Sequence, residues 1–278
     1  MIPEGRAIAR GYLLTAVAGI AIVATAVLQP IPQDLQYHMF ADTRTLLSIP
    51  NFWNVMSNVP FIFAGAAGLL FAGSPHRDGL SPLLRPAYIV FFAGVLMTAF
   101  GSAWYHLAPD NRTLVWDRLP MTLAFMAFFT VIIGEHISAA RARKLLLPLL
   151  IAGVLSVAYW AMTEAWGRGD LRPYALVQFL PMLLIPLILL MYRSRFDRTA
   201  FIWWVVAIYA ASKLLEHYDH SIFALGGVIS GHSLKHIVAA MAPAVLLYGF
   251  AARRPVTNPP AQRLKQNVNK ATVGNDVP

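Results

Sequence analysis

Three short runs hold the residues that could do chemistry in this very hydrophobic chain. They are GSAWYH (101–106), WDRLPM (116–121) and GHSLKH (231–236). Each places ionisable or metal-binding side chains in or beside a stretch that is otherwise typical of a membrane span. A charged side chain at the centre of a bilayer helix costs roughly 2.5–3.5 kcal/mol even on the lenient insertion scale. These groups must be satisfied by one another, by water or by a metal, so the three runs are the predicted functional site.

The histidine spacing in these runs is typical of a metal site. His232 and His236 are four residues apart, so on a helix they share one face, about 6 Å apart along the axis, and can bind one ion. Ser102 and His106 have the same spacing on another predicted helix. A third nitrogen from His106 would give the usual catalytic zinc arrangement, with a vacant position for water. The chain has no cysteine, so any metal must use His, Asp or Glu.

Two further polar side chains could act beside such a metal. Asp117 could accept a proton from the bound water, whose pKa zinc lowers to about 7, and Ser102 could donate a hydrogen bond to a developing oxyanion. Other interpretations stay open. An HxxxH pair also serves haem or a proton relay, and an intramembrane His often forms a hydrogen bond between helices. Asp117 could instead pair with Arg118, and Glu216 with Lys213.

The composition predicts a membrane protein. The chain has 278 residues, of which 58% are hydrophobic and 13% charged, against about 25% charged in a soluble domain. Eight apolar stretches are long enough to span a bilayer. They lie near 11–28, 51–72, 86–108, 117–138, 145–165, 173–192, 199–217 and 232–252. We predict an all-α polytopic membrane protein with a seven-transmembrane-helix bundle core plus one extra N-terminal transmembrane helix.

The basic residues predict its orientation. A net charge of +9 could indicate a nucleic-acid partner, but the Lys and Arg residues sit in short clusters between apolar stretches, which is the membrane-topology pattern. Fifteen of the 22 lie at one set of helix ends and four at the opposite ends. We therefore predict no nucleic-acid partner, both termini in the cytoplasm, and the three runs towards the outer face. The short loops fit a bacterial inner membrane.

Four segments are predicted along the chain. Residues 1–28 form an N-terminal transmembrane helix, 29–50 an outer-face segment, 51–252 the catalytic core and 253–278 a polar cytoplasmic tail. The first segment also resembles a signal peptide, since basic residues precede its apolar run. That run is longer than a usual h-region and lacks a clear cleavage site, so we expect a retained helix or an uncleaved signal anchor.

Taken together, SAWYH, WDRLPM and HSLKH resemble the alkaline ceramidases, which belong to the CREST superfamily of membrane hydrolases. That family has a Ser four residues before a His, an Asp eleven residues after that His, and a late HxxxH. The matching positions in this chain are Ser102, His106, Asp117, His232 and His236. The words NFWNVMSN (51–58) and LPM (119–121) also match, and the resemblance covers about 51–252.

The resemblance implies a function and a role for each residue. The three histidines would hold zinc, Asp117 would accept and donate the proton, and Ser102 would polarise the scissile carbonyl. The implied reaction is hydrolysis of a ceramide-like membrane lipid into a sphingoid base and a fatty acid within the bilayer. Animal members carry an acidic calcium-binding cluster before the FWN word. Here Asn51 stands where an acid is expected and Asp42 remains, so calcium binding is doubtful.

Three alternatives stay open at this stage. The chain could be a receptor-like member of the same superfamily, with a structural metal. It could be a lipid-remodelling esterase, because the same site chemistry serves amides and esters. It could also be a His-based proton or haem membrane carrier, although no polar path leads from the three runs to the other face. The sequence leaves the oligomeric state open.

Overall fold

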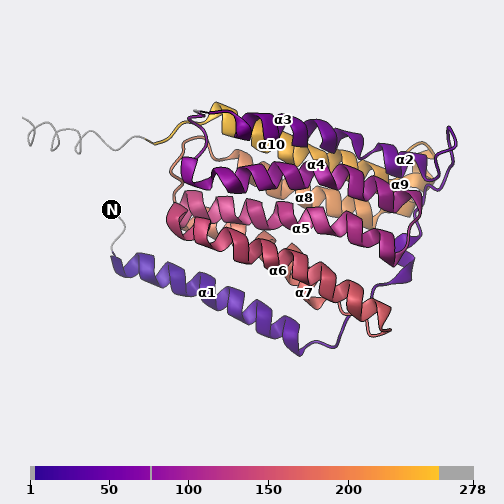
Figure 1. The fold of residues 1–278 in the computed structure, drawn as a ribbon, viewed down its shortest axis with the longest axis horizontal. Coiled ribbons are helices and arrows are strands. Elements are labelled where there is room, and N and C mark those ends of the chain that lie inside the picture. Colours follow the sequence, from indigo (N-terminus) through magenta and orange to yellow (C-terminus); the bar gives the residue numbers. More distant parts are fainter. Residues whose placement is uncertain (1–3, 76, 257–278) are drawn as a thin grey trace, which may run out of the picture.

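The chain forms a bundle of long helices in the computed structural model, which describes residues 4–75 and 77–256 (Figure 1). Within these residues there is no β-strand, and extended pairing is limited to two isolated bridges. The helical elements in chain order are α1 (Glu4–Val27), η1 (Leu35–His38), α2 (Phe52–Met56), α3 (Val59–Gly73), η2 (Pro82–Leu84), α4 (Arg85–Leu107), α5 (Asn111–Ile133), η3 (Gly134–Ser138), α6 (Ala139–Ala165), α7 (Arg172–Met191), α8 (Phe201–His217), α9 (Asp219–Gly226) and α10 (Gly231–Ala252).

The prediction of an all-helical membrane protein is confirmed, but its count of seven spans plus one is not. Six segments of the described chain are long and apolar enough to cross a membrane. One of them, Asn111–Ala165, is a 55-residue run that contains both α5 and α6. The chain reverses inside this run, where Ser138 has an extended backbone and α6 packs back against α5. A second difference is α8, whose 17 residues fall short of the ~20 that a span needs.

The helices that carry the three runs lie together in the bundle. Helix α4 packs between α3 and α5, while α10 packs against α8 and α3. Helix α1 lies at one side, where it contacts α7 and leaves most of its surface exposed (Figure 1). The core between α3, α4, α5, α7 and α10 is filled by large apolar side chains such as Phe92, Phe128 and Ile185. These contacts leave α1 peripheral to the part of the fold that holds the site.

Helices α4 and α5 approach closely where two of the predicted runs meet. Pro120 lies inside α5 and has no N–H, so the carbonyl of Trp116, four residues earlier, lacks its usual helical donor. Gly101 of α4 packs against this carbonyl, because a Cβ on Gly101 would lie only 2.0 Å from the Trp116 oxygen. The Gly and the Pro of the two runs therefore bring Ser102 and Asp117 to adjoining positions on neighbouring helices.

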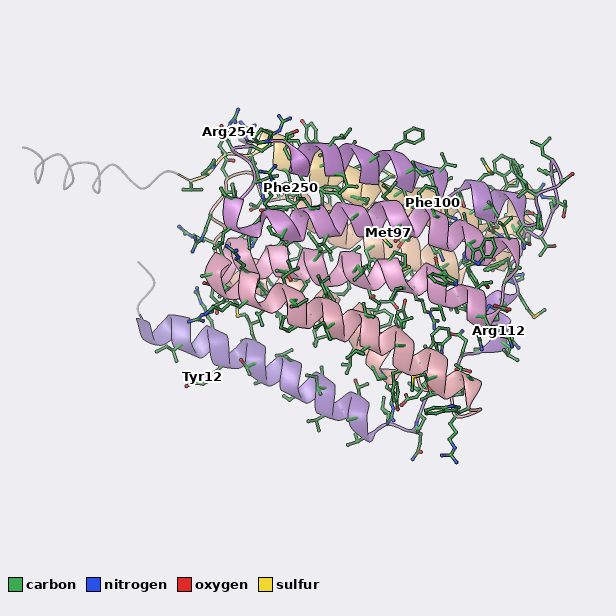
Figure 2. All side chains as sticks on the ribbon, viewed as in Figure 1. Tyr12, Met97, Phe100, Arg112, Phe250 and Arg254 are labelled. Atoms are coloured by element: carbon green, nitrogen blue, oxygen red, sulfur yellow. The ribbon has the colours of Figure 1, made fainter. Side chains whose placement is uncertain are left out.

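A buried ion pair closes the opposite end of the bundle. The Arg253 guanidinium binds both carboxylate oxygens of Glu135 in η3, and Tyr88 of α4 donates to Glu135 Oε1 at 2.5 Å. Figure 2 shows Phe250 and Arg254 at this end, away from Arg112 at the other. Arg253 is the first residue of the predicted tail, yet it is fully buried. Residues 257–278 of that predicted tail lie outside the described residues.

Candidate metal centre and active site

The three predicted histidine ligands come together in the fold. Nε2 of His106, near the end of α4, lies 3.3 Å from Nε2 of His232 and 3.3 Å from Nε2 of His236, both in the first turns of α10. The ligand atoms of the three rings all lie within 4.8 Å of one another, and all three side chains are buried. No other group of three His, Asp or Glu residues in the described part of the chain has this property.

Hydrogen bonds limit how the rings can present a nitrogen to this centre. The Ser57 hydroxyl donates to the Asn54 carbonyl oxygen at 3.1 Å and lies 2.8 Å from Nδ1 of His236, which also has the Asn58 amide nitrogen 3.4 Å away. In the tautomer with the proton on Nδ1, the Ser57 oxygen accepts the hydrogen bond from it and Nε2 of His236 carries a lone pair. Nε2 of His232 lies 3.1 Å from the Lys235 ammonium, which can only donate. Nε2 of both rings faces Nε2 of His106 at 3.3 Å, so a single cation between the three rings would be bound by all three nitrogens.

Residues of the NFWNVMSN segment (51–58) make hydrogen bonds to the helices that carry the histidines. Asn51 donates through Nδ2 to the carbonyl oxygen of His106 at 2.8 Å, and Asn54 accepts through Oδ1 from the Ser233 hydroxyl at 2.8 Å. Asp219 accepts the backbone N–H of His232 at 2.7 Å. These bonds join α2, α4, α9 and α10 at one end of the bundle, so the ligand positions are set by buried polar contacts between helices.

Several residues beside the histidines were not predicted. The Phe40 ring packs on those of His106 and His232, with centroids 4.7 and 4.5 Å away. The Lys235 ammonium, from the HSLKH word itself, lies 2.8 Å from Glu216. The helix period places Lys235 beside His232, but nothing in the sequence says which element faces it. The predicted alternative of a Glu216–Lys213 pair is confirmed, at 2.7 Å.

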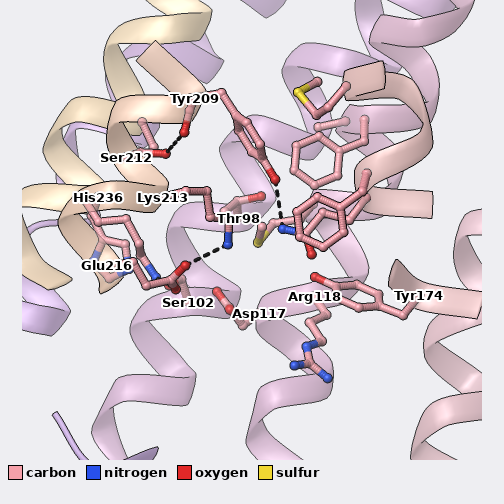
Figure 3. Close-up of a pocket in the computed structure, with 18 of the residues that line it drawn as sticks. Thr98, Ser102, Asp117, Arg118, Tyr174, Tyr209, Ser212, Lys213, Glu216 and His236 are labelled. Atoms are coloured by element: carbon pink, nitrogen blue, oxygen red, sulfur yellow. Dashed lines mark hydrogen bonds and ion pairs between the residues drawn. The ribbon is translucent and has the colours of Figure 1, made fainter. Parts of the chain in front are cut away.

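The remaining two predicted site residues line a cavity next to the histidines. The cavity has a volume of about 460 Å³. Ser102 and Asp117 lie side by side in its wall, close to His236 (Figure 3). No ion pair joins Asp117 to Arg118 among the described residues, contrary to one of the alternatives above. The Asp117 carboxylate is buried and is not one of the three residues of the histidine group.

The cavity is amphipathic. Its polar wall includes Lys213, Glu216 and Arg118 besides Ser102, Asp117 and His236, while most of the remaining lining is apolar. The apolar wall is formed by side chains of α3, α4, α5, α7, α8 and α10, among them Phe61, Phe91, Val95, Phe128, Met182 and Leu246. A polar reacting group and a long hydrocarbon chain can therefore be held in one continuous space.

Comparison with known proteins agrees with this geometry. A family model described as Ceramidase matches residues 45–272, which is most of the chain. The chain belongs to the Ceramidase family. The resemblance seen in the sequence is thereby confirmed, and membership in the Ceramidase family indicates a membrane hydrolase that acts on a lipid amide. The family is metal-dependent, in keeping with the three buried histidines. No curated protein matches the chain.

The segment before the FWN sequence, where the resemblance raised the question of calcium, makes hydrogen bonds within the chain itself. Asp42 accepts hydrogen bonds from Arg44 on both carboxylate oxygens, at 2.9 and 2.7 Å. Burial acts to raise the pKa of Asp42, but these bonds outweigh it and hold the pKa of that carboxyl below its usual value. Asn51 points to the His106 carbonyl. The one acid left in this region is thus already paired with a cation of the chain itself.

Proposed function

We propose that this protein is a zinc-dependent intramembrane hydrolase of a lipid amide bond, with a ceramide-like lipid cleaved to a sphingoid base and a fatty acid. The observation that carries the proposal is the convergence of three histidine nitrogens beside an amphipathic cavity lined by Ser102 and Asp117. Family membership supports the reaction class.

The donor set suits zinc. Three neutral imidazoles from His106, His232 and His236 would hold the ion, as in catalytic sites that keep one position open. Bound there, zinc would supply a Lewis acid and lower the pKa of water. The proposal does not include calcium, because the Asp42 carboxylate is paired with Arg44.

Ser102 and Asp117 are assigned the remaining chemistry. The Ser102 hydroxyl donates a hydrogen bond to the carbonyl oxygen of the substrate, where negative charge develops during attack. Asp117 takes a proton from the attacking water on a carboxylate oxygen and delivers it to the nitrogen of the leaving amine. The C–N bond breaks and one water is consumed, so the amide yields a carboxylic acid and an amine.

We assign the protein to a bacterial inner membrane, with both termini cytoplasmic and the site towards the outer face. The substrate would enter from the bilayer, with its acyl chain along the apolar wall of the cavity. In this scheme 1–28 is a retained helix, 29–50 an outer segment, 51–252 the catalytic core and 253–278 a cytoplasmic tail. The excess of basic residues at the helix ends on the same side as the two termini, fifteen against four at the opposite ends, supports this orientation.

The direct test compares two histidine variants. Purified His232→Ala and wild-type protein are analysed for zinc by mass spectrometry and incubated with a panel of N-acyl and O-acyl lipids. His217→Ala is the matched control, since His217 is exposed on α8. We expect His232→Ala to lose both zinc and amide hydrolysis while the control keeps them.

Three outcomes would redirect the proposal. Unchanged hydrolysis in His232→Ala would overturn the zinc mechanism. Products from O-acyl lipids alone would make the protein an esterase. A haem absorption spectrum in the purified protein would favour a carrier.

A further inference from the structure

One cation in the cavity wall, Arg118, forms no ion pair with any of the described residues. Arg118 is 5% exposed and lines the cavity. Its Nη2 donates to Oε1 of Gln33 at 2.6 Å, and its buried Nη1 makes no hydrogen bond within the described part of the chain. A buried charge is costly unless it is paired.

Aromatic rings surround the Arg118 guanidinium without accepting hydrogen bonds from its N–H groups. The guanidinium carbon lies 4.2 Å from the centroid of the Trp160 ring, 4.6 Å from that of Tyr174 and 5.8 Å from that of Tyr37. Aromatic faces attract a cation but accept no conventional hydrogen bond. Asp34 also lines the cavity, but its carboxylate caps η1 by accepting the backbone N–H of Gln36 at 2.9 Å.

Arg118 lies at one end of the cavity, next to the reacting groups. Gln33 and Tyr37, which contact it, belong to the segment that precedes the family match. Asp117 precedes Arg118 in the sequence. Figure 3 shows the Arg118 side chain beside Tyr174, on the side away from Tyr209. In the opposite direction, the cavity reaches Phe128, which is ten residues from Arg118, or about 15 Å further along α5. An acyl chain placed against Phe128 leaves the other part of the substrate near Arg118.

We propose that Arg118 binds an acidic group, a carboxylate or a phosphate, on the amine portion of the lipid amide. The proposal rests on the hydrolase function above and narrows its substrate class to N-acyl lipids with an anionic headgroup. A guanidinium offers parallel N–H donors that match such oxyanions. The hydroxyl groups of an unmodified ceramide are neutral, so they would provide no counter-anion for the buried positive charge of Arg118.

The experiment first measures binding to metal-depleted protein, so that it does not depend on turnover. The probes are N-palmitoylglycine and its methyl ester, which differ in one charge, and ceramide with and without a phosphate on its headgroup. Binding is followed by calorimetry in detergent for wild type and Arg118→Gln. The matched control is Arg112→Gln, an exposed arginine of the same helix. Hydrolysis of the same four lipids by zinc-loaded protein follows.

The expected result is a preference for charge that depends on Arg118. Wild type and Arg112→Gln should bind the acidic member of at least one pair about 10- to 100-fold more tightly than the neutral one. Arg118→Gln should lose this preference while its affinity for the neutral lipids stays within a few-fold, and any loss of hydrolysis should appear in KM. Which pair responds identifies carboxylate or phosphate.

Equal binding of acidic and neutral lipids by wild type would overturn the proposal even if Arg118→Gln does not fold. An equal loss of affinity for the acidic and the neutral lipid of a pair in Arg118→Gln would also overturn the proposal. Arg118 would then have a structural role only, holding α5 and the segment around Gln33 together. If the preference holds but no lipid amide is hydrolysed, the acidic site stands and the hydrolase function fails.

Discussion

Ser57, in the turn between α2 and α3, contacts the back of one predicted zinc ligand on α10. Its hydroxyl lies 2.8 Å from Nδ1 of His236, while Nε2 on the other side of that ring faces Nε2 of His106 at 3.3 Å. Such a partner sets both the tautomer and the angle of the ring, and it raises the basicity of the nitrogen that binds a metal.

Replacing Ser57 should therefore weaken metal binding without removing a ligand. We expect Ser57→Ala to lower zinc affinity by about 10- to 100-fold, measured by competition with a chromophoric chelator. Ser74→Ala is the control, because Ser74 lies at the far end of α3 and bonds only to the local Leu70 carbonyl. Equal zinc affinity in both variants would show that His236 is oriented by packing alone.

Asp117→Asn separates chemistry from metal binding. The substitution preserves the shape of the side chain and breaks no ion pair seen in the described residues. Zinc content should stay as in wild type, while kcat for the lipid amide falls about 10²- to 10⁴-fold because the proton acceptor is lost. Full turnover by the Asn variant would remove Asp117 from the mechanism and favour a receptor-like protein with a structural metal.

The close approach of α4 and α5 makes Gly101 sensitive to any side chain. A Cβ there would lie 2.0 Å from the Trp116 carbonyl oxygen, so Gly101→Ala must push the two helices apart. We expect a loss of roughly 1–3 kcal/mol in unfolding free energy and a lower kcat, since Ser102 and Asp117 move with their helices. Gly19→Ala in α1, where a Cβ meets nothing within 4 Å, should leave stability unchanged or slightly higher.

An ion pair in the α6–α7 connection predicts acid sensitivity. The hydrogen bond from Arg172 lowers the pKa of Asp170 to about 2, against burial, which acts to raise it. Because this folded-state pKa is below the unfolded value of about 3.9, the pair stabilises fully above about pH 4 and loses its contribution as the pH falls towards 2. The loss is measured as the fall in the thermal unfolding temperature, in detergent, between pH 6 and pH 2.

The corresponding variant is Arg172→Gln, which should unfold at a lower temperature near pH 6 and show a shallower decline below pH 4. Arg168→Gln, an exposed arginine of the same connection, should keep the wild-type slope. An unchanged slope in Arg172→Gln would mean that another group titrates in this range.

The sequence by itself determined the features that depend on local periodicity and composition. Apolar runs predicted an all-helical membrane protein, and the four-residue spacing of His232 and His236 put both rings on one face of a helix that the structure contains. The motif pattern predicted the Ceramidase family, which the family match confirms. These properties follow from hydrophobicity and from the helix repeat, so neighbouring residues suffice to specify them.

Only the tertiary structure decided how the helices face one another. It placed the chain reversal at Ser138, between α5 and α6 and inside one apolar run of 55 residues. It also placed Ser57 beside His236 and left Arg118 buried with no ion pair to the described residues. Such contacts join residues far apart in the chain, and they depend on helix packing at ångström precision. No local pattern encodes that packing, because any face of an apolar helix can meet any other until the whole bundle is assembled.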